Sequence, residues 1–340
     1  MDGFTPRHDG DYLWDRSAPV DPVVVRLEDA LAPLAYDAKQ RPLALPARRI
    51  RRWPFVLAAA AVLLIAGWHT VLNWRLRWPA GRAWSLTLEM PSGDRRGGAL
   101  AVGERLDVGD GGAVIDIARL GAMRALPGTA LQLQSTSTDR HVLSMERGKI
   151  EVRVWAPPGR LLVRTPAGTV VDLGCAFKLI VDDDAATLLV RSGWVQLNNG
   201  FGEALVPEGA LSLMSPRSRP TVPIYEDAPP ALVGAVRSFE LSTGDRERAL
   251  AAMLDHARPR DVLTLLMLIE RGMPQPDAAQ IARRAAELVP PPPGVTLDQV
   301  SRGEGEAIWA WYRRLSLPSP KAWMKNWRDG LPPWLFSLPR

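Results

Sequence analysis

The feature that most restricts the fold of this chain is an uncharged stretch from Trp53 to Trp74. Between Arg52 and Arg75 there is no charged residue over 22 positions. A helix needs about 20 apolar residues to cross a hydrocarbon core of ~30 Å. A buried core helix seldom stays uncharged for so long, and a signal peptide would lie at the start of a chain. We therefore expect residues 53–74 to form a single transmembrane helix.

The flanks of this stretch predict its anchoring and orientation. Trp53 stands at one end and Trp68 and Trp74 at the other, where indole rings settle into the headgroup layer of a bilayer. Arg51 and Arg52 abut the first end. Within about 15 residues of the stretch, six basic residues precede it and three follow it. They are Lys39, Arg41, Arg48, Arg49, Arg51 and Arg52 before it, and Arg75, Arg77 and Arg82 after it. The positive-inside rule then predicts a bacterial inner-membrane protein with a cytoplasmic N-terminus and periplasmic C-terminal domains.

Residues 1–52 are expected to form a short cytoplasmic tail with one amphipathic helix. Asp21 followed by Pro22 is typical of a helix N-cap and first helical position. Apolar residues then recur at spacings of four and three, which places them on one helix face. They are Val20, Val24, Leu27, Leu31 and Leu34. One helix cannot bury this face alone, so it predicts a partner protein or the membrane surface, unless the tail is a disordered leader.

Residues 75–225 show the pattern of an all-β domain. Trp84, Leu86, Leu88 and Met90 alternate with polar residues, as in a half-buried strand. Similar short apolar runs follow, each closed by glycine or proline. Many short strands at this spacing indicate a roll, sandwich, barrel or solenoid.

Within this domain, residues 168–179 (GTVVDLGCAFKL) and 188–197 (LLVRSGWVQL) resemble the core signature of FecR-type domains. Together with residues 126–131 and 143–152, the resemblance covers about residues 95–215. The positions that carry the motif are Leu173, Gly174, Phe177, Gly193 and Val195. Cys175 stands where the family usually has threonine. The resemblance implies a membrane-anchored FecR-like regulator of the anti-sigma-factor kind; such regulators usually have a longer cytoplasmic domain than this chain.

Residues 226–340 change to a helical period and predict a C-terminal α-helical repeat or bundle. We expect five helices, the last starting at a capping box of Thr296 and Gln299 and continuing to Leu315. Five tryptophans are interleaved with Arg and Lys between residues 309 and 334. This mixture is typical of packing in a small domain, of contact with a membrane surface or glycan, or of single-stranded nucleic-acid binding. Periplasmic placement argues against nucleic acid.

The sequence contains no catalytic or metal-binding constellation with specific spacing. The chain has one cysteine, Cys175, and four dispersed histidines, so neither an internal disulfide nor a thiolate metal cluster can form. The formal charge of +5 is explained in part by the basic cluster at the membrane boundary, which suits anionic lipid. We expect a non-enzyme without cofactors that does not bind nucleic acid.

Two main hypotheses remain from the sequence. The first is a single-pass inner-membrane FecR-like protein that transmits a signal to transcription. It would bind a periplasmic or outer-membrane protein outside and an extracytoplasmic-function sigma factor or other regulator inside. The alternative is a non-catalytic scaffold or adaptor of the cell envelope. A membrane-anchored glycan binder is a weaker alternative.

Overall fold

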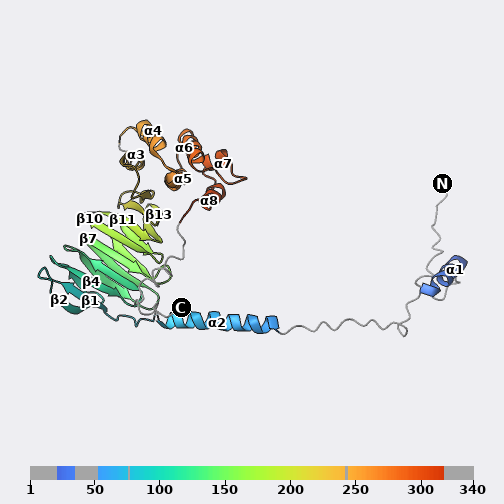
Figure 1. Ribbon diagram of the computed structural model, residues 1–340, viewed down its shortest axis with the longest axis horizontal. Coiled ribbons are helices and arrows are strands. Elements are labelled where there is room, and N and C mark those ends of the chain that lie inside the picture. Colours follow the sequence, from blue (N-terminus) through green and yellow to red (C-terminus); the bar gives the residue numbers. More distant parts are fainter. Residues whose placement is uncertain (1–20, 35–52, 76, 242–243, 318–340) are drawn as a thin grey trace, which may run out of the picture. The chain divides into compact units, whose positions relative to one another are not determined.

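The computed structural model describes residues 21–34, 53–75, 77–241 and 244–317 (Figure 1). For residues 53–56, 68, 69, 71–73 and 75 it describes the backbone alone. The chain forms two compact units, residues 1–65 and residues 66–340, and each has its own internal contacts.

The first unit contains helix α1, Pro22–Leu31, followed by the short 3-10 helix η2, Ala32–Leu34. The Asp21 carboxylate accepts a hydrogen bond of 2.7 Å from the backbone N–H of Val23, and Pro22 occupies the first turn. Both residues therefore start the helix as their types predict, because an N-cap oxygen satisfies an N–H group that has no partner inside the helix.

Helix α2, Trp53–Arg75, contains the uncharged stretch. Pro54 lies in its first turn, where a missing N–H costs nothing. In the part of the chain with described side chains, no helix is long and apolar enough to cross a membrane.

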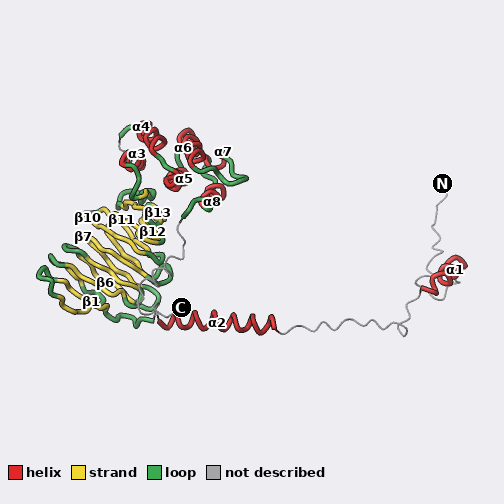
Figure 2. The backbone as a smooth tube through the Cα atoms, in the orientation of Figure 1, coloured by secondary structure: helices red, strands yellow, loops and turns green. Residues whose placement is uncertain are grey.

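Fifteen strands lie between residues 84 and 225 of the described chain, drawn in yellow in Figure 2. The first eight are β1 (Trp84–Glu89), β2 (Arg95–Leu100), β3 (Arg105–Asp107), β4 (Gly112–Ile117), β5 (Gly121–Ala125), β6 (Ala130–Thr136), β7 (His141–Val154) and β8 (Leu161–Thr165). The others are β9 (Gly168–Asp172), β10 (Ala176–Asp182), β11 (Ala185–Ser192), β12 (Trp194–Asn199), β13 (Gly202–Pro207), β14 (Ala210–Met214) and β15 (Ile224–Tyr225). They form a large mixed sheet of short strands, as the alternating pattern predicts.

The sheet is built around β7, which is 14 residues long. Its first half pairs with β6 and, in parallel, with β8, whereas its second half pairs antiparallel with β5 and β10. The change occurs near Gly148, whose φ of 102° suits glycine. A Cβ there would lie 2.4 Å from the Cα of Thr129, so the close approach of the two strands also requires glycine.

Alternate residues of these strands point into one apolar core. In β7, Ile150, Val152 and Val154 are buried, while Glu151 and Arg153 between them are exposed. Trp84 is fully buried, and its indole N–H donates to the Thr136 hydroxyl at 3.1 Å. The core therefore follows the period of two that the sequence shows.

The C-terminal part of the described chain is helical, shown red after the last strands in Figure 2. Its elements are α3 (Pro230–Glu240), α4 (Arg246–His256), η3 (Pro259–Asp261), α5 (Val262–Glu270), α6 (Gln275–Leu288), α7 (Leu297–Ser301) and α8 (Gly305–Tyr312). The buried side chains of these helices belong to the same apolar cluster as those of the sheet.

The predicted fifth helix is wrong in one respect, because it is divided into α7 and α8. The capping box is present: Thr296 and Gln299 exchange hydrogen bonds with each other's backbone N–H. However, Gly303 adopts a φ of 74°, which ends α7. Trp311 is fully buried and donates its indole N–H to the carbonyl of Val289 at 3.1 Å, whereas Trp309 is 59% exposed.

Candidate functional site

The predicted amphipathic helix is present as α1, and its apolar face is exposed in the described part of the chain. No residue of α1 is buried. Leu27, Leu31 and Leu34 are 59%, 51% and 80% exposed, and Val24 is partly exposed. Val20, the first member of the stripe, lies outside the described residues. Since apolar surface is stabilised by removal from water, this face is the strongest candidate for a protein contact.

The residues predicted to anchor the chain are described in part. Arg51 and Arg52 lie outside the described residues, and Trp53 and Trp68 lie in α2 without described side chains. Trp74 is 64% exposed. Between residues 57 and 67 every side chain of α2 is exposed, Leu63 and Leu64 at 72% and 75%. This helix, like α1, therefore presents an uncovered apolar surface.

The residues of the FecR-like motif have structural roles in the turns and strands from β9 to β12. Gly174 and Gly193 have φ angles of 86° and 76°, which L side chains rarely adopt. Phe177 and Val195 are buried, and Leu173 is partly buried. The motif brings β9, β10 and β12 into place, and it offers no exposed chemical group of its own.

This turn also contains a buried carboxyl that the sequence analysis missed. The Asp172 carboxylate accepts hydrogen bonds from the Cys175 backbone N–H at 3.0 Å and from the Cys175 thiol at 2.6 Å. Its second oxygen, Oδ2, has no hydrogen-bond partner among the described residues. Burial raises the pKa of Asp172 to about 6, although the bonds from Cys175 and Gly174 oppose the rise.

Burial likewise raises the pKa of the Cys175 thiol, and the Asp172 charge adds to this effect. A thiol in this state is a poor nucleophile. Cys175 therefore acts as a packed, weakly polar side chain. The sequence contained one signal for a buried carboxyl at this position. Asp172 lies two residues after Val170, which faces inward, and the alternation of the strand predicts an apolar residue there.

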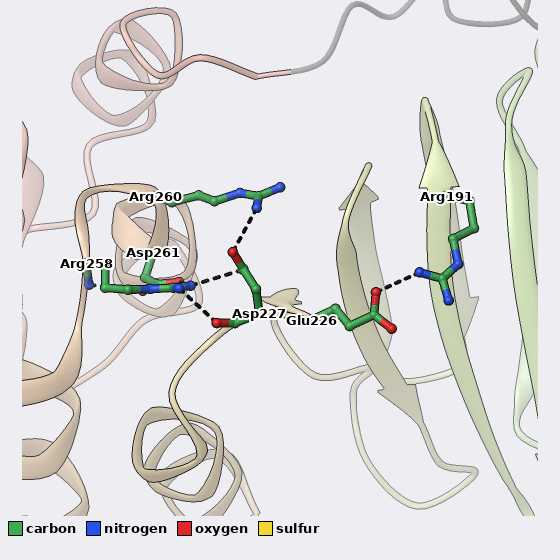
Figure 3. A network of polar contacts seen from close by, with 6 residues as sticks. All are labelled: Arg191, Glu226, Asp227, Arg258, Arg260 and Asp261. Carbon is green, nitrogen blue, oxygen red and sulfur yellow. Dashed lines mark hydrogen bonds and ion pairs between the residues drawn. The ribbon is translucent and has the colours of Figure 1, made fainter.

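A second polar cluster lies where the chain passes from the sheet to the helices (Figure 3). The Arg258 guanidinium contacts the Asp261 carboxylate at 2.8 Å and the Asp227 carboxylate at 3.1 Å. The Asp261 side chain is fully buried, and Arg258 also donates to the backbone carbonyl of Asp227. Arg260 contacts the other oxygen of Asp227 at 3.3 Å. The hydrogen bond from Arg258 lowers the pKa of Asp227 and keeps that carboxylate charged.

Further contacts tie the same helices to the strand edge. Arg260 lies over the Tyr225 ring at 3.9 Å, and the Thr264 hydroxyl donates to the backbone carbonyl of Pro223 at 2.7 Å. On the sheet, Arg191 pairs with Glu226 at 2.7 Å, and both side chains are about half exposed (Figure 3). The first two contacts attach η3 and α5 to β15 and to the residue before it, and the third joins β11 to the residue after β15.

The described polar clusters are suited to binding and positioning. No group of three His, Cys, Asp or Glu residues in the described ranges is arranged to hold a metal ion. The Asp227 network consists of two carboxylates paired with two guanidinium groups, and these contacts fix the positions of the four side chains.

The chain was compared with known proteins. None of the protein-family models matches it, and none of the curated proteins matches it. Two crystal structures of a "putative anti-sigma factor" from Parabacteroides distasonis are distantly similar, with TM-scores of 0.27 and 0.26 and 19% sequence identity. The similarity covers 39% of this chain and 58% of that chain, so this chain matches little more than half the length of that protein.

Proposed function

We propose that this chain is a membrane-anchored regulator whose α1 face binds a cytoplasmic protein. The observation that carries the proposal is the apolar stripe of α1 and η2, in which Leu27, Leu31 and Leu34 are more than half exposed. An isolated helix of this length is marginal in water, so a groove on a partner would stabilise both the helix and its apolar face. The sequence resemblance to FecR-type domains favours a sigma factor as that partner.

In this proposal α2 is the membrane anchor and the β domain is the part that meets an envelope protein. The support for the anchor is the uncharged sequence from Trp53 to Trp74 and the exposed apolar side chains described for α2. The bias of basic residues toward the N-terminal flank supports a cytoplasmic location for residues 1–52. A change of partner at the β domain would then alter the availability of α1 on the other side.

The docking role is tested by capture of the partner on the full chain. The Leu27→Asp, Leu31→Asp variant puts two charges on the stripe. A matched control, Val25→Asp with Ala32→Asp, adds the same two negative charges on the side of the helix that faces away from the stripe. We expect a sigma factor to co-purify with the parent and with the control but not with the stripe variant. Loss of the sigma factor from both variants, or its capture by all three chains, would contradict docking through this face. If no specific protein co-purifies with the parent chain, the result favours the hypothesis of an envelope scaffold.

Topology is tested by labelling with a membrane-impermeant maleimide in intact cells whose outer membrane has been opened. Cys175 is fully buried, so the parent chain supplies a silent background. We expect a Ser92→Cys variant in the β domain to react at once and an Asp29→Cys variant in α1 to react only after the inner membrane is permeabilised. The reverse pattern, or protection of both sites, would contradict the proposed orientation.

A further inference from the structure

A cavity of about 320 Å³ lies between the segment that follows β14 and the C-terminal ends of α3 and α5. This volume is at the lower end of the range for small-molecule sites, which is about 300–1,000 Å³. The residues that carry the argument below are Arg219, Phe239, Glu240, Arg246 and Arg271. None of the residues that line the cavity belongs to α1 or to the Asp227 network.

Arg271 and Glu240 form a largely buried ion pair on one wall. The Arg271 guanidinium contacts Glu240 Oε1 at 2.5 Å, with the two side chains 22% and 9% exposed. Glu240 Oε2 accepts a hydrogen bond of 2.9 Å from the backbone N–H of Val222. Both carboxylate oxygens are therefore engaged, while a guanidinium has five N–H groups and can serve a second anion.

Arg246 is also held in place at the cavity. It contacts the Asp277 carboxylate at 2.8 Å and lies over the Phe239 ring at 4.2 Å. Because a carboxylate and an aromatic face fix its position, the guanidinium is oriented before any ligand arrives. Such preorganisation reduces the entropy lost on binding.

Arg219 supplies positive charge that the cavity does not neutralise. It is exposed, and no carboxylate among the described residues forms an ion pair with it. The cavity lining thus contains three guanidinium groups and one carboxylate. Burial lowers the pKa of Arg271, and the charge of Arg219 contributes in the same direction, against the attraction of Glu240. Another negative charge between the two arginines would relieve this repulsion.

We propose that this cavity binds a small anion that carries carboxylate or phosphate groups. Arg219 and Arg271 supply the charge, since guanidinium groups match the geometry of both anions. Because the lining combines the segment after β14 with α3, α4 and α5, an occupied site strengthens the attachment of the helices to the sheet. This binding activity is independent of the proposed docking by α1.

The test is isothermal titration calorimetry of the full chain in an uncharged, phosphate-free detergent at constant ionic strength. The probes are citrate and inorganic phosphate, which separate carboxylate from phosphate preference. We expect saturable binding of at least one probe, weakened about tenfold or more by Arg219→Gln through loss of a charged contact. Arg217→Gln is the matched control, since Arg217 is 83% exposed, contacts Asp184 at 3.4 Å and lies outside the cavity lining.

Each result decides the proposal. Binding by the parent and the Arg217→Gln control, together with loss in Arg219→Gln, supports it. Absence of saturable binding of both probes up to millimolar concentrations would overturn it, as would equal affinity of parent and Arg219→Gln. Equal weakening by Arg217→Gln would overturn it too, because the effect would then come from net charge alone. Urea unfolding of each variant checks that the fold is unchanged.

Discussion

The β domain and helix α1 place the same residue types in opposite environments. Leu133, Leu143 and Leu188 are fully buried in the sheet, whereas Leu27 and Leu31 of α1 are more than half exposed. The alternation in the sheet is satisfied within the chain, because neighbouring strands and helices cover the inward face. The stripe of α1 has the right period but no cover in the described chain. A hydrophobic pattern therefore predicts which side chains share a face, and only the structure tells whether the chain itself buries that face.

The sharpest contrast is between a buried and an exposed tryptophan. We expect Trp84→Ala to lower the free energy of unfolding by about 3–5 kcal/mol, because it leaves a cavity in the core and removes the hydrogen bond to Thr136. Trp309→Ala removes the same side chain from a site that is 59% exposed and should cost about 1 kcal/mol or less. Urea unfolding followed by circular dichroism measures both. Similar losses from the two variants would contradict the assigned core.

The buried Asp172 carboxyl makes the stability of the β domain depend on pH. The pKa of Asp172 is raised from 3.8 to about 6, so the folded chain binds the proton more tightly than the unfolded chain. Stability contributed by this group is therefore present below about pH 4 and lost as the pH rises to about 6. We expect Asp172→Asn to gain stability relative to the parent over that interval, by up to ~3 kcal/mol.

The measurement is urea unfolding of parent and variant at several pH values between 4 and 7. His141 is a second buried titratable group, and its pKa is lowered to about 4 mainly by burial. Its contribution has the opposite sign, since stability is lost as the pH falls from 6.5 to 4. The difference between parent and variant isolates Asp172. A difference that does not change with pH would contradict the raised pKa.

Two of the ion pairs in Figure 3, Arg258 with Asp261 and Arg191 with Glu226, give a smaller contrast. Arg258→Ala leaves the fully buried Asp261 carboxylate without its guanidinium partner and should cost about 2 kcal/mol. Arg191→Ala breaks a pair whose side chains are about half exposed and should cost about 1 kcal/mol or less. Thermal unfolding in low and high salt compares them. Equal costs would mean that burial of Asp261 does not determine the strength of the junction.

The smallest effect is expected in α1. Leu27→Ala and Leu31→Ala remove side chains that contact no core, so each should change the stability of the purified chain by less than about 0.5 kcal/mol. The same changes in the presence of the bound partner should weaken complex formation. A large loss of stability without a partner would show that the rest of the chain covers this face, and the proposed docking role would fail.

The alternation of the strands and the capping signals predicted much of the fold, because they depend on neighbouring residues. The strand beginning at Trp84, the N-cap at Asp21 and the capping box at Thr296 are all observed. The break at Gly303 was missed although the sequence contains a signal for it: residues 301–306 carry no apolar side chain and include two glycines. Gly303 adopts the left-handed conformation that ends α7.

The candidate sites could be predicted from the sequence less completely than the fold. The α1 stripe could be predicted because it lies within one helix. The Asp227 and Arg271 clusters could not, since their partners are 31 residues apart and meet only through tertiary packing. Asp172 gave a weak local signal, a charged residue at an inward position, which becomes meaningful only when its burial is known.

The pairing of β7 with strands on both halves has a consequence for the folding kinetics. Four other strands use this one strand as their template, two through its first half and two through its second. Neither pair of strands can complete its backbone hydrogen bonds until β7 is in its final position. A shift of β7 by one residue would turn its inward-facing side chains outward along both halves. The β domain should therefore fold as one cooperative unit, with the amides of β7 among the last to exchange with solvent deuterium.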